Sequence, residues 1–396
     1  MYDPSNEGGL AIYTKNVSNA LAKEGCDVYL LTANPYIFQK APGLLFHVND
    51  SLFAMEARPV FQRSSLLWAA DRTYKHCANV RMRKRFADAL HPAVIHIQVT
   101  APIIDVFYLP YLKKKYKIVY TVHDVFAHTK NLTQTPWALK RIYEQADHLI
   151  VHAKSNKSQL QQLFGIEGGK ITVIPHGTHI PSEQLPEKEE SRRVLNLPPD
   201  AFIILFFGVI RANKGLALLI KSLLRVVSKH RAVALLIAGS PPFKDSFEEY
   251  QQLIEELAMQ QHIISHIRFI PDDMTQHYYR ASDIVALPYT SFGSQSGVLL
   301  QAYYYQRPVI VTDAGGMGEQ VKEDDSGIVI SPGSCVELSD AIIAMLESPA
   351  AFKQYACNML RAAREKYSWD IVAQKTLQLY IDICNAPTRC NEKISS

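Results

Sequence analysis

The chain has 396 residues, enough for two or three domains, and its 47% hydrophobic and 20% charged residues are ordinary for a globular protein. This composition excludes wholesale disorder, and no apolar run reaches the roughly 18 residues that span a bilayer. Residues 1–7 have neither the basic nor the apolar region of a signal peptide. The six cysteines form no CxxC motif, which is typical of reduced thiols in a cytoplasmic protein.

The net charge of +4 is unevenly distributed. Residues 1–181 hold 21 basic and 13 acidic side chains, a net charge of +8, whereas residues 182–396 hold 21 and 25, a net charge of −4. Two basic clusters, 81–85 and 113–117, lie in the first half. They indicate either solvated helix faces or peripheral contact with an anionic membrane, at its inner face. No nucleic-acid partner is expected.

Short apolar, β-branched runs alternate with helical stretches along the whole chain. The predicted strands are 28–32, 94–97, 118–122, 148–151 and 171–174 in the first half, and 203–207, 234–238, 267–270, 284–287 and 309–312 in the second. Continuous apolar strands that alternate with helices indicate parallel sheets covered on both faces. The sequence therefore predicts an α/β fold with two Rossmann-like, doubly wound domains.

A polar, proline-punctuated segment from Pro181 to Glu190 separates the two patterns. We therefore predict an N-terminal domain over 1–180, a linker over 181–200, and a C-terminal domain over 201–366. A final helix, 367–386, is expected to cross back to the first domain, with a cleft between the two domains.

The first domain departs from the usual pattern at its start. A doubly wound domain opens with a buried strand, but here the Gly8-Gly9 turn and a helix over 10–23 follow seven mostly polar residues. The first strand of the N-terminal sheet is apparently missing. Either the sequence starts inside a longer chain, or this domain lacks a central strand or fills its place with another segment.

In the second half, glycine and basic residues follow the predicted strand 203–207. Ligands of open α/β sheets bind at the carboxyl ends of strands, and Gly208 allows close approach of the backbone there. Arg211 and Lys214 lie in the same loop and would supply cations for a diphosphate. A surface role for Lys214 is the alternative.

Two further small-residue loops follow strands 284–287 and 309–312. The first, residues 288–298, leads into a predicted helix over 299–306, and free N–H groups at a helix start favour an anion. The second, residues 312–319, is glycine-rich and ends in the carboxylate of Glu319. Three such loops in order at strand ends predict a phosphate-containing ligand.

Together these motifs resemble those of the retaining family 4 glycosyltransferases of the GT-B fold, the "glycosyl transferases group 1" type, over nearly the whole chain. The matching segments, in order, are Gly8-Gly9, 121–124, 146–155, 170–177, 208–215, 281–288, 308–319 and Tyr367-Ser368-Trp369.

The resemblance implies a transferase that moves a sugar from a UDP- or GDP-sugar to a glycan or lipid-linked acceptor of polysaccharide biosynthesis, with retention and with no metal or other cofactor. His123, Arg211 and Lys214 are implied as catalytic. The implied substrate-binding residues are Gly8, Gly9, Gly208, Gln295, Ser296, Gly297, Val298, Gln301 and Glu319.

Three positions depart from the family's pattern. Gly293 and Gln301 stand where the family has two glutamates, and Val209 stands where an arginine is common. A glutamine still hydrogen-bonds ribose hydroxyls, but without charge assistance. A non-catalytic binding or partner protein, or another GT-B enzyme such as a nucleotide-sugar epimerase or a phosphorylase, are the alternative functions.

Other residues admit a metal or dinucleotide interpretation that we consider weaker. The histidine pairs 123/128 and 176/179 lack cysteine or carboxylate partners at ligand spacing. Asp272-Asp273 is expected in a loop after a strand, and Tyr303 to Tyr305 in helix packing. Gly8-Gly9 is not followed by the GxGxxG pattern of a dinucleotide site.

Overall fold

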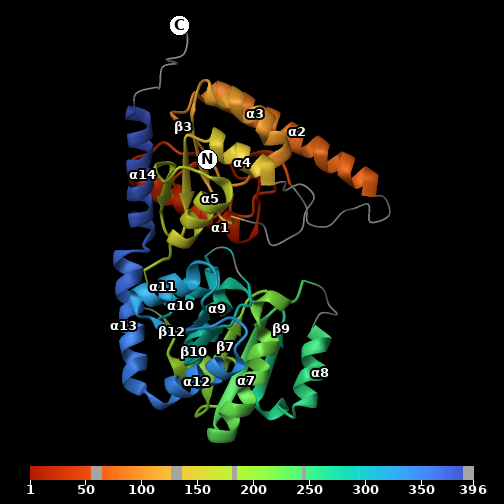
Figure 1. Ribbon diagram of the computed structural model, residues 1–396, viewed down its shortest axis with the longest axis vertical. Coiled ribbons are helices and arrows are strands. Elements are labelled where there is room, and N and C mark those ends of the chain that lie inside the picture. Colours follow the sequence, from red (N-terminus) through yellow and green to blue (C-terminus); the bar gives the residue numbers. More distant parts are fainter. Residues whose placement is uncertain are drawn as a thin grey trace. The chain divides into compact units, whose positions relative to one another are not determined.

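The computed structural model describes residues 1–54, 65–125, 136–180, 185–242, 247–291, 293 and 295–386. The chain divides into two compact units. Unit 1 comprises Met1–His152, Lys157–Gly177 and Trp369–Ser396, and unit 2 comprises Ala153–Asn156 and Thr178–Ser368. Figure 1 shows that each unit consists of a parallel sheet with helices packed around it.

Unit 1 contains two parallel sets of strands and their covering helices. Its strands are β1 (Tyr29–Asn34), β2 (His47–Phe53), β3 (Val94–Ile97), β4 (Lys117–Thr121), β5 (His148–Val151) and β6 (Ile171–Val173). Its helices are α1 (Gly8–Lys23), α2 (Ser65–Leu90), α3 (Pro102–Lys113), α4 (Pro136–Gln145), most of α5 (Lys154–Phe164) and α14 (Trp369–Asn385). The strand orders are β1-β2 and β3-β4-β5-β6, so neighbouring strands follow one another along the chain.

The place of a strand between β1 and β3 is taken by the residues around Tyr2. Tyr2 forms parallel bridges to Leu31 and Ile97, and its N–H donates to His96 O at 2.8 Å while its C=O accepts from Gln98 N at 2.9 Å. Among the described residues no regular strand precedes α1. The first strand of a usual doubly wound domain is thus reduced here to a bridge that joins the two sets of strands.

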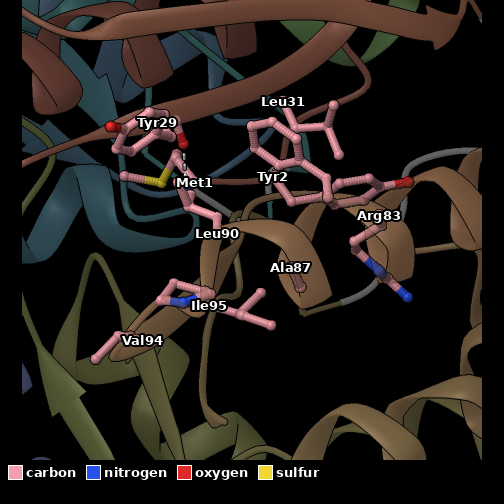
Figure 2. A pocket seen from close by; sticks show the side chains of 11 residues that line it. Met1, Tyr2, Tyr29, Leu31, Arg83, Ala87, Leu90, Val94 and Ile95 are labelled. Carbon is pink, nitrogen blue, oxygen red and sulfur yellow. Dashed lines mark hydrogen bonds between the residues drawn. The ribbon is translucent and has the colours of Figure 1, made fainter.

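A small open pocket lies beside this bridge. Figure 2 shows Tyr2 and Met1 at its edge, with apolar side chains of β1, α2 and β3 around it. The guanidinium of Arg83 lies 4.5 Å from the centroid of the Tyr2 ring. Arg83 also forms a buried ion pair with Asp105, which ties α2 to α3 beside the bridge.

Unit 2 has one six-stranded parallel sheet of order β12-β11-β10-β7-β8-β9. The strands are β7 (Phe202–Phe207), β8 (Val233–Gly239), β9 (Ile263–Ile267), β10 (Ile284–Leu287), β11 (Val309–Thr312) and β12 (Gly327–Ile330). The helices are α6 (Lys188–Val194), α7 (Leu216–Lys229), α8 (Glu248–Glu256), α9 (Asp272–Ala281), α10 (Gly297–Tyr304), α11 (Gly316–Asp324), α12 (Cys335–Glu347) and α13 (Pro349–Glu365).

Both faces of this sheet are buried, which explains its continuous apolar strands. Along β7, Ile203 and Leu205 point into one hydrophobic cluster, whereas Ile204 and Phe206 point into another on the opposite face. Helices cover both faces, as a parallel sheet requires. The doubly wound fold predicted from the sequence is confirmed.

One aspartate motif is repeated in the two units with the same geometry. Asp147 exchanges two hydrogen bonds with Ile118, donating its N–H to the carbonyl and accepting from the amide, both at 2.8 Å. Asp283 does the same with Ile203, at 2.8 and 2.7 Å. Each aspartate thus ties the start of one strand to the start of a neighbouring strand. The motif shared with the family has a structural role at both places.

Parts of the predicted segmentation differ from the structure. Residues 188–194, assigned to the linker, form α6, which packs on α9 within unit 2 through the buried Arg192. Arg192 donates to Ala281 O at 3.0 Å and to Asp283 at 2.9 Å. The strand expected at 267–270 is β9 at 263–267, and the sequence pattern missed β2 and β12 altogether. All three strands lie at sheet edges, where most side chains are only partly buried, and polar residues interrupt the apolar run in β2 and β9 but not in β12.

Candidate active site

The strand order of unit 2 creates a crevice at the carboxyl ends of two neighbouring strands. From β7 the chain continues outward to β8 and β9, then returns to β10 on the other side of β7 and continues to β11 and β12. The loops after β7 and β10 therefore leave in opposite directions. Ligands of open α/β sheets bind at this kind of switch point. The predicted residues of loops 208–215 and 288–298 lie there.

The loop after β7 is held tightly against the loop after β10. Gly208 has a φ of +102°, and a Cβ there would lie 3.3 Å from the side chain of Val298. Gly215 has a φ of +73°, and a Cβ there would lie 1.9 Å from Pro288 O. Thr290 N–H donates to Asn213 O at 2.9 Å. The close approach of the two loops therefore requires glycine at position 215.

The side chain of Tyr289 contacts both Lys214 and the N-cap residue of α10. The Lys214 ammonium lies 3.7 Å from the centroid of the Tyr289 ring, which is buried. Burial raises the pKa of Tyr289 to about 12, so its hydroxyl stays protonated. That hydroxyl lies 3.3 Å from Oγ of Ser296, the N-cap of α10. Tyr289 thus places a cation beside a helix N-terminus.

The first turn of α10 is suited to an anion. Ser296 Oγ accepts from Leu299 N at 3.4 Å, while Gly297 and Val298 begin the helix, where N–H groups have no partner within the helix. Gly297 is exposed, and a Cβ there would meet nothing within 4 Å. The first residue of the helix is therefore accessible to a ligand.

The remaining predicted residues of unit 2 occupy different surroundings. Arg211 is exposed at the start of a short 3-10 turn. Gln295 packs near Gly316, at whose position a Cβ would lie 3.3 Å from Gln295 Nε2. Gln301 is exposed and its Oε1 accepts from the hydroxyl of Tyr279 at 2.8 Å.

The carboxylate of Glu319 forms hydrogen bonds that the sequence did not indicate. Its Oε1 accepts from Lys154 N and its Oε2 from Ser155 N, both at 2.9 Å. Residues 153–156 belong to the same unit as Glu319. Both carboxylate oxygens are thus used to hold this short segment, and Asn156 adds a bond to Gly293 O at 2.7 Å.

In unit 1, Gly8 and Gly9 open helix α1. Gly8 has a φ of +80°, and a Cβ at either glycine would meet nothing within 4 Å. Both are exposed. The turn before them is fixed by Asp3, which is buried and accepts from the Thr14 hydroxyl of α1 and from Ser5 N. An exposed backbone turn thus lies at the carboxyl edge of the sheet.

A row of polar side chains follows the successive strands β3 to β6 at the same edge. Gln98 follows β3, His123 follows β4, His152 follows β5 and His176 follows β6. Oε1 of Gln98 lies 2.9 Å from Nε2 of His123, and Nδ1 of His123 lies 3.2 Å from Nε2 of His152. His152 Nδ1 lies 2.9 Å from Ile174 O.

Two aromatic side chains, Tyr13 and Trp369, pack against this row. The Tyr13 ring centroid lies 4.9 Å from those of His123 and His176, and 5.5 Å from that of Trp369 in α14. Burial lowers the pKa of His152 to about 4 and that of His176 to about 3, and it lowers the pKa of His123 well below its ordinary value. The imidazoles are therefore neutral at physiological pH and can act as hydrogen-bond acceptors.

Of this row the sequence analysis identified only His123 as functional. The signal for the others was present, because parallel strands that follow one another along the chain bring their carboxyl ends to one edge. A polar residue directly after three of the predicted strands, and one residue later after the fourth, indicates such a row. Of the proposed metal pairs, His128 lies outside the described residues. In the part of the chain that the structure describes, no group of three or more histidine, cysteine or acidic residues could hold a metal ion.

Comparisons with known proteins agree with this architecture. The family model "Glycosyltransferase Family 4" matches residues 7–180, and "Glycosyl transferases group 1" matches residues 187–366. An uncharacterised glycosyltransferase of Methanocaldococcus jannaschii is 26% identical, over 96% of this chain and 95% of the relative. A D-inositol 3-phosphate glycosyltransferase of Rhodococcus erythropolis is 26% identical over 66% of this chain, which spans 62% of that relative's length.

Solved structures share the fold. HepE of Anabaena, solved in complex with UDP, has a TM-score of 0.75 and 17% identity, over 96% of this chain and 98% of that one. The same protein has also been solved with UDP-glucose, with a TM-score of 0.74. Two consecutive family models and two Rossmann-like units lead to one conclusion: the chain belongs to the family 4 glycosyltransferases of the GT-B fold.

Proposed function

We propose that this glycosyltransferase moves a sugar from a UDP- or GDP-sugar to a hydroxyl group of a glycan or lipid-linked acceptor, with retention of anomeric configuration. The observation that carries the proposal is the pairing of Lys214 with the N-terminus of α10 at the switch point of unit 2. A diphosphate is the ligand chemistry that fits a fixed ammonium beside free helix amides. The solved complexes of HepE with UDP and with UDP-glucose support this choice of donor.

The roles follow from charge development during transfer. Negative charge builds on the diphosphate as the glycosidic bond breaks, and Lys214 with the first amides of α10 would stabilise it. These groups would supply the charge stabilisation that a metal ion supplies elsewhere. Arg211 is exposed in the same loop and is the second candidate cation. Gln301 would hydrogen-bond ribose hydroxyls in place of the family's glutamate, once its bond with Tyr279 opens or is shared.

In unit 1 the proposed roles lie with the exposed glycine turn and the histidine row. Backbone amides of Gly8 and Gly9 would face the donor phosphates or the acceptor, because both glycines are exposed. His123 would lie beside the transferred sugar. As a neutral imidazole it would exchange a hydrogen bond with a sugar hydroxyl without repelling the sugar's developing positive charge.

We also propose peripheral contact with an anionic membrane. However, two of the basic residues that suggested this contact are engaged in ion pairs within the protein. In cluster 81–85, Arg83 is buried in an ion pair, and Lys84 pairs with Asp88 at 2.5 Å. These two charges are therefore not available as free surface cations. Among the described residues no helix has the length and apolar character needed to cross a bilayer.

Helix α3 carries exposed apolar side chains next to lysines, a combination that suits contact with an anionic membrane. Ile103, Phe107 and Tyr111, spaced four residues apart, are 39, 65 and 61% exposed. Residues of this spacing share one helix face. The exposed Lys113 and Lys114 end the same helix, and the Lys114 ammonium lies 5.8 Å from the Tyr111 ring. Apolar side chains next to lysines are typical of surfaces that enter the headgroup region of anionic membranes.

The decisive experiment has two steps. A thermal-shift screen first identifies which UDP- or GDP-sugar stabilises the protein. Mass spectrometry then detects whether the sugar of that donor is transferred or hydrolysed, with and without hydroxyl compounds as acceptors. We expect stabilisation by one nucleotide class and transfer or slow hydrolysis of the sugar. Binding without turnover in any acceptor mixture would instead support a non-catalytic binding protein. A free epimerised sugar nucleotide would support an epimerase.

A further inference from the structure

Arg307, in the turn before β11, is a buried arginine whose charge is not paired within the protein. It is 8% exposed, and its Nε is enclosed without a hydrogen-bond partner. Among the described residues, no carboxylate forms an ion pair with it and no group accepts a hydrogen bond from its side chain. A buried charge without a partner costs free energy, so folded proteins rarely keep one. The partner of this guanidinium is therefore expected to come from outside the chain.

The sheet register places Arg307 beside Asp283. Val309 of β11 pairs with Val285 of β10, so the residues two positions earlier, Arg307 and Asp283, are neighbours directly before these strands. Asp283 is also the acidic residue whose charge acts on Arg307. Both lie at the amino ends of β10 and β11, whereas the loops of the candidate active site follow the carboxyl ends of β7 and β10.

The carboxylate of Asp283 is already used by other groups. Its Oδ1 accepts from the ammonium of Lys188 at 2.5 Å. Its Oδ2 accepts from the guanidinium of Arg192 at 2.9 Å and from the amide of Ile203 at 2.7 Å. Two cations thus share this one carboxylate, so it does not neutralise a third cation beside them.

A second arginine without a carboxylate partner acts on the same place. Nε of Arg280, near the end of α9, donates to Pro186 O at 2.8 Å, and in the part of the chain that the structure describes this arginine forms no ion pair. Burial, and then the positive charge of Arg280, lower the pKa of Arg307 to about 10. Arg307 therefore stays protonated at neutral pH, and the two guanidinium groups repel each other.

We propose that Arg280 and Arg307 form a binding site for a phosphate dianion at the amino ends of β10 and β11, either inorganic phosphate or the phosphate group of a small phosphomonoester. A guanidinium group donates two parallel hydrogen bonds to such an oxyanion, and two negative charges match two unpaired positive ones. The terminal nitrogens of Arg307, unlike its Nε, are not enclosed, so an anion can reach them from solvent.

This site is separate from the proposed donor site around Lys214. The two lie at opposite ends of β10, whose four residues span roughly 13 Å at 3.3 Å per residue. A phosphate held by Arg307 therefore does not belong to the reacting diphosphate. The inference does not rest on the proposed function, because binding at this site requires no sugar transfer.

The test combines calorimetric titration of the full chain with phosphate and thermal unfolding in phosphate or in chloride of equal ionic strength. We compare Arg307→Met and Arg280→Met with the wild type, because methionine keeps an unbranched apolar side chain and removes the charge. The control is Arg231→Met, which removes an exposed arginine of the same unit. Lys214→Ala weakens anion binding at the donor site and so distinguishes the two sites.

We expect phosphate to bind and stabilise the wild type, Arg231→Met and Lys214→Ala. Its affinity should fall about 10- to 100-fold in Arg307→Met and in Arg280→Met, because each variant removes charged hydrogen bonds. In chloride, Arg307→Met should unfold at the same temperature as the wild type or at a higher one, because it no longer buries an unpaired charge. Phosphate should reduce or reverse this difference. Glycerol 3-phosphate that binds more tightly than inorganic phosphate would identify a phosphomonoester as the ligand, and weaker or equal binding would identify free phosphate.

Phosphate that binds Arg307→Met as tightly as the wild type would overturn the proposal. So would stabilisation by phosphate no greater than by chloride, or binding that disappears in Lys214→Ala, because the donor site would then account for it. An Arg307→Met variant that unfolds below the wild type in chloride would show that the protein itself stabilises this charge, which also contradicts the proposal. If Arg307→Met does not fold, the titration of Arg280→Met decides. A wild type that transfers no sugar would contradict the proposed function and leave this test unaffected.

Discussion

The ammonium of Lys214 lies 3.7 Å from the ring centroid of Tyr289, although the two residues belong to different loops. This contact holds a flexible side chain against a buried ring. The Tyr289 carbonyl accepts from the Thr312 hydroxyl at 2.6 Å, which connects the same loop to the end of β11. The cation is therefore fixed by the packed loops of the switch point before any ligand arrives, so little reorganisation is needed during the reaction.

The first prediction follows from this placement. Lys214→Ala should lower kcat by about 100- to 1,000-fold, because removing a preorganised group that stabilises developing charge costs about 3–4 kcal/mol. Steady-state kinetics with saturating donor measure the effect. The control is Lys221→Ala, an exposed lysine of α7, which should behave as the wild type. Unchanged turnover of Lys214→Ala at saturating donor would remove Lys214 from the catalytic set.

A second prediction concerns the stability of unit 1. Asp105 is buried, pairs with Arg83 and accepts from Ala101 N at 2.7 Å. Asp105→Ala leaves the Arg83 charge buried without its partner, so we expect a loss of about 3–5 kcal/mol in the free energy of unfolding. Urea unfolding measures it. In contrast, Asp88→Ala removes only partly exposed ion pairs with Lys84 and Lys115 and should leave the free energy of unfolding nearly unchanged. Equal losses would contradict the distinction.

The positions of the main loops could be predicted because parallel strands impose them. Gly208, Lys214 and Ser296 were identified from the strands that precede them, and those strands, β7 and β10, formed almost within the predicted bounds. Their apolar runs are continuous since both faces of the sheet are buried. The edge strand β2 could not be found in the same way, because its sequence HVNDSLF is half-exposed and polar.

The pairings between loops could not be predicted from the sequence. Lys214 and Tyr289 meet only because β7 and β10 are neighbours, and strand order is a property of the whole sheet. The hydrogen bonds of Glu319 could not be predicted either. Its carboxylate accepts from backbone amides of residues far away in the chain, so it is not free to bind a ligand. The histidine row likewise depends on the order β3-β4-β5-β6. Residue types at strand ends were therefore predictable, whereas their partners were not.

The third prediction concerns how the buried histidines make the free energy of unfolding depend on pH. Burial lowers the folded-state pKa of His152 to about 4, below the unfolded value of about 6.5. Between these values the unfolded chain binds the proton and the folded chain does not. The free energy of unfolding should therefore fall as the pH decreases from about 6.5 to about 4, by about 1.4 kcal/mol per pH unit for each such histidine.

His152→Phe should reduce this slope by the contribution of one histidine, while its other buried imidazoles keep the rest. Urea unfolding at several pH values between 4 and 7 measures both slopes. His47→Gln, which removes an exposed imidazole, controls for the loss of a histidine as such. Identical slopes in the wild type and His152→Phe would show that folding does not lower the pKa of His152.

The last prediction tests the membrane surface of α3. Replacement of both Phe107 and Tyr111 by serine should reduce co-sedimentation with vesicles of mixed neutral and anionic lipids, because these exposed rings would enter the headgroup region. Lys113→Gln with Lys114→Gln should reduce it as well, and only this part should depend on salt, since each cation near the surface contributes about 1 kcal/mol that salt screens. The control is Trp137→Ser in α4, which removes an exposed aromatic residue of another helix. If anionic and neutral vesicles retain the wild type equally poorly, the membrane proposal fails, and a soluble glycan becomes the acceptor to test.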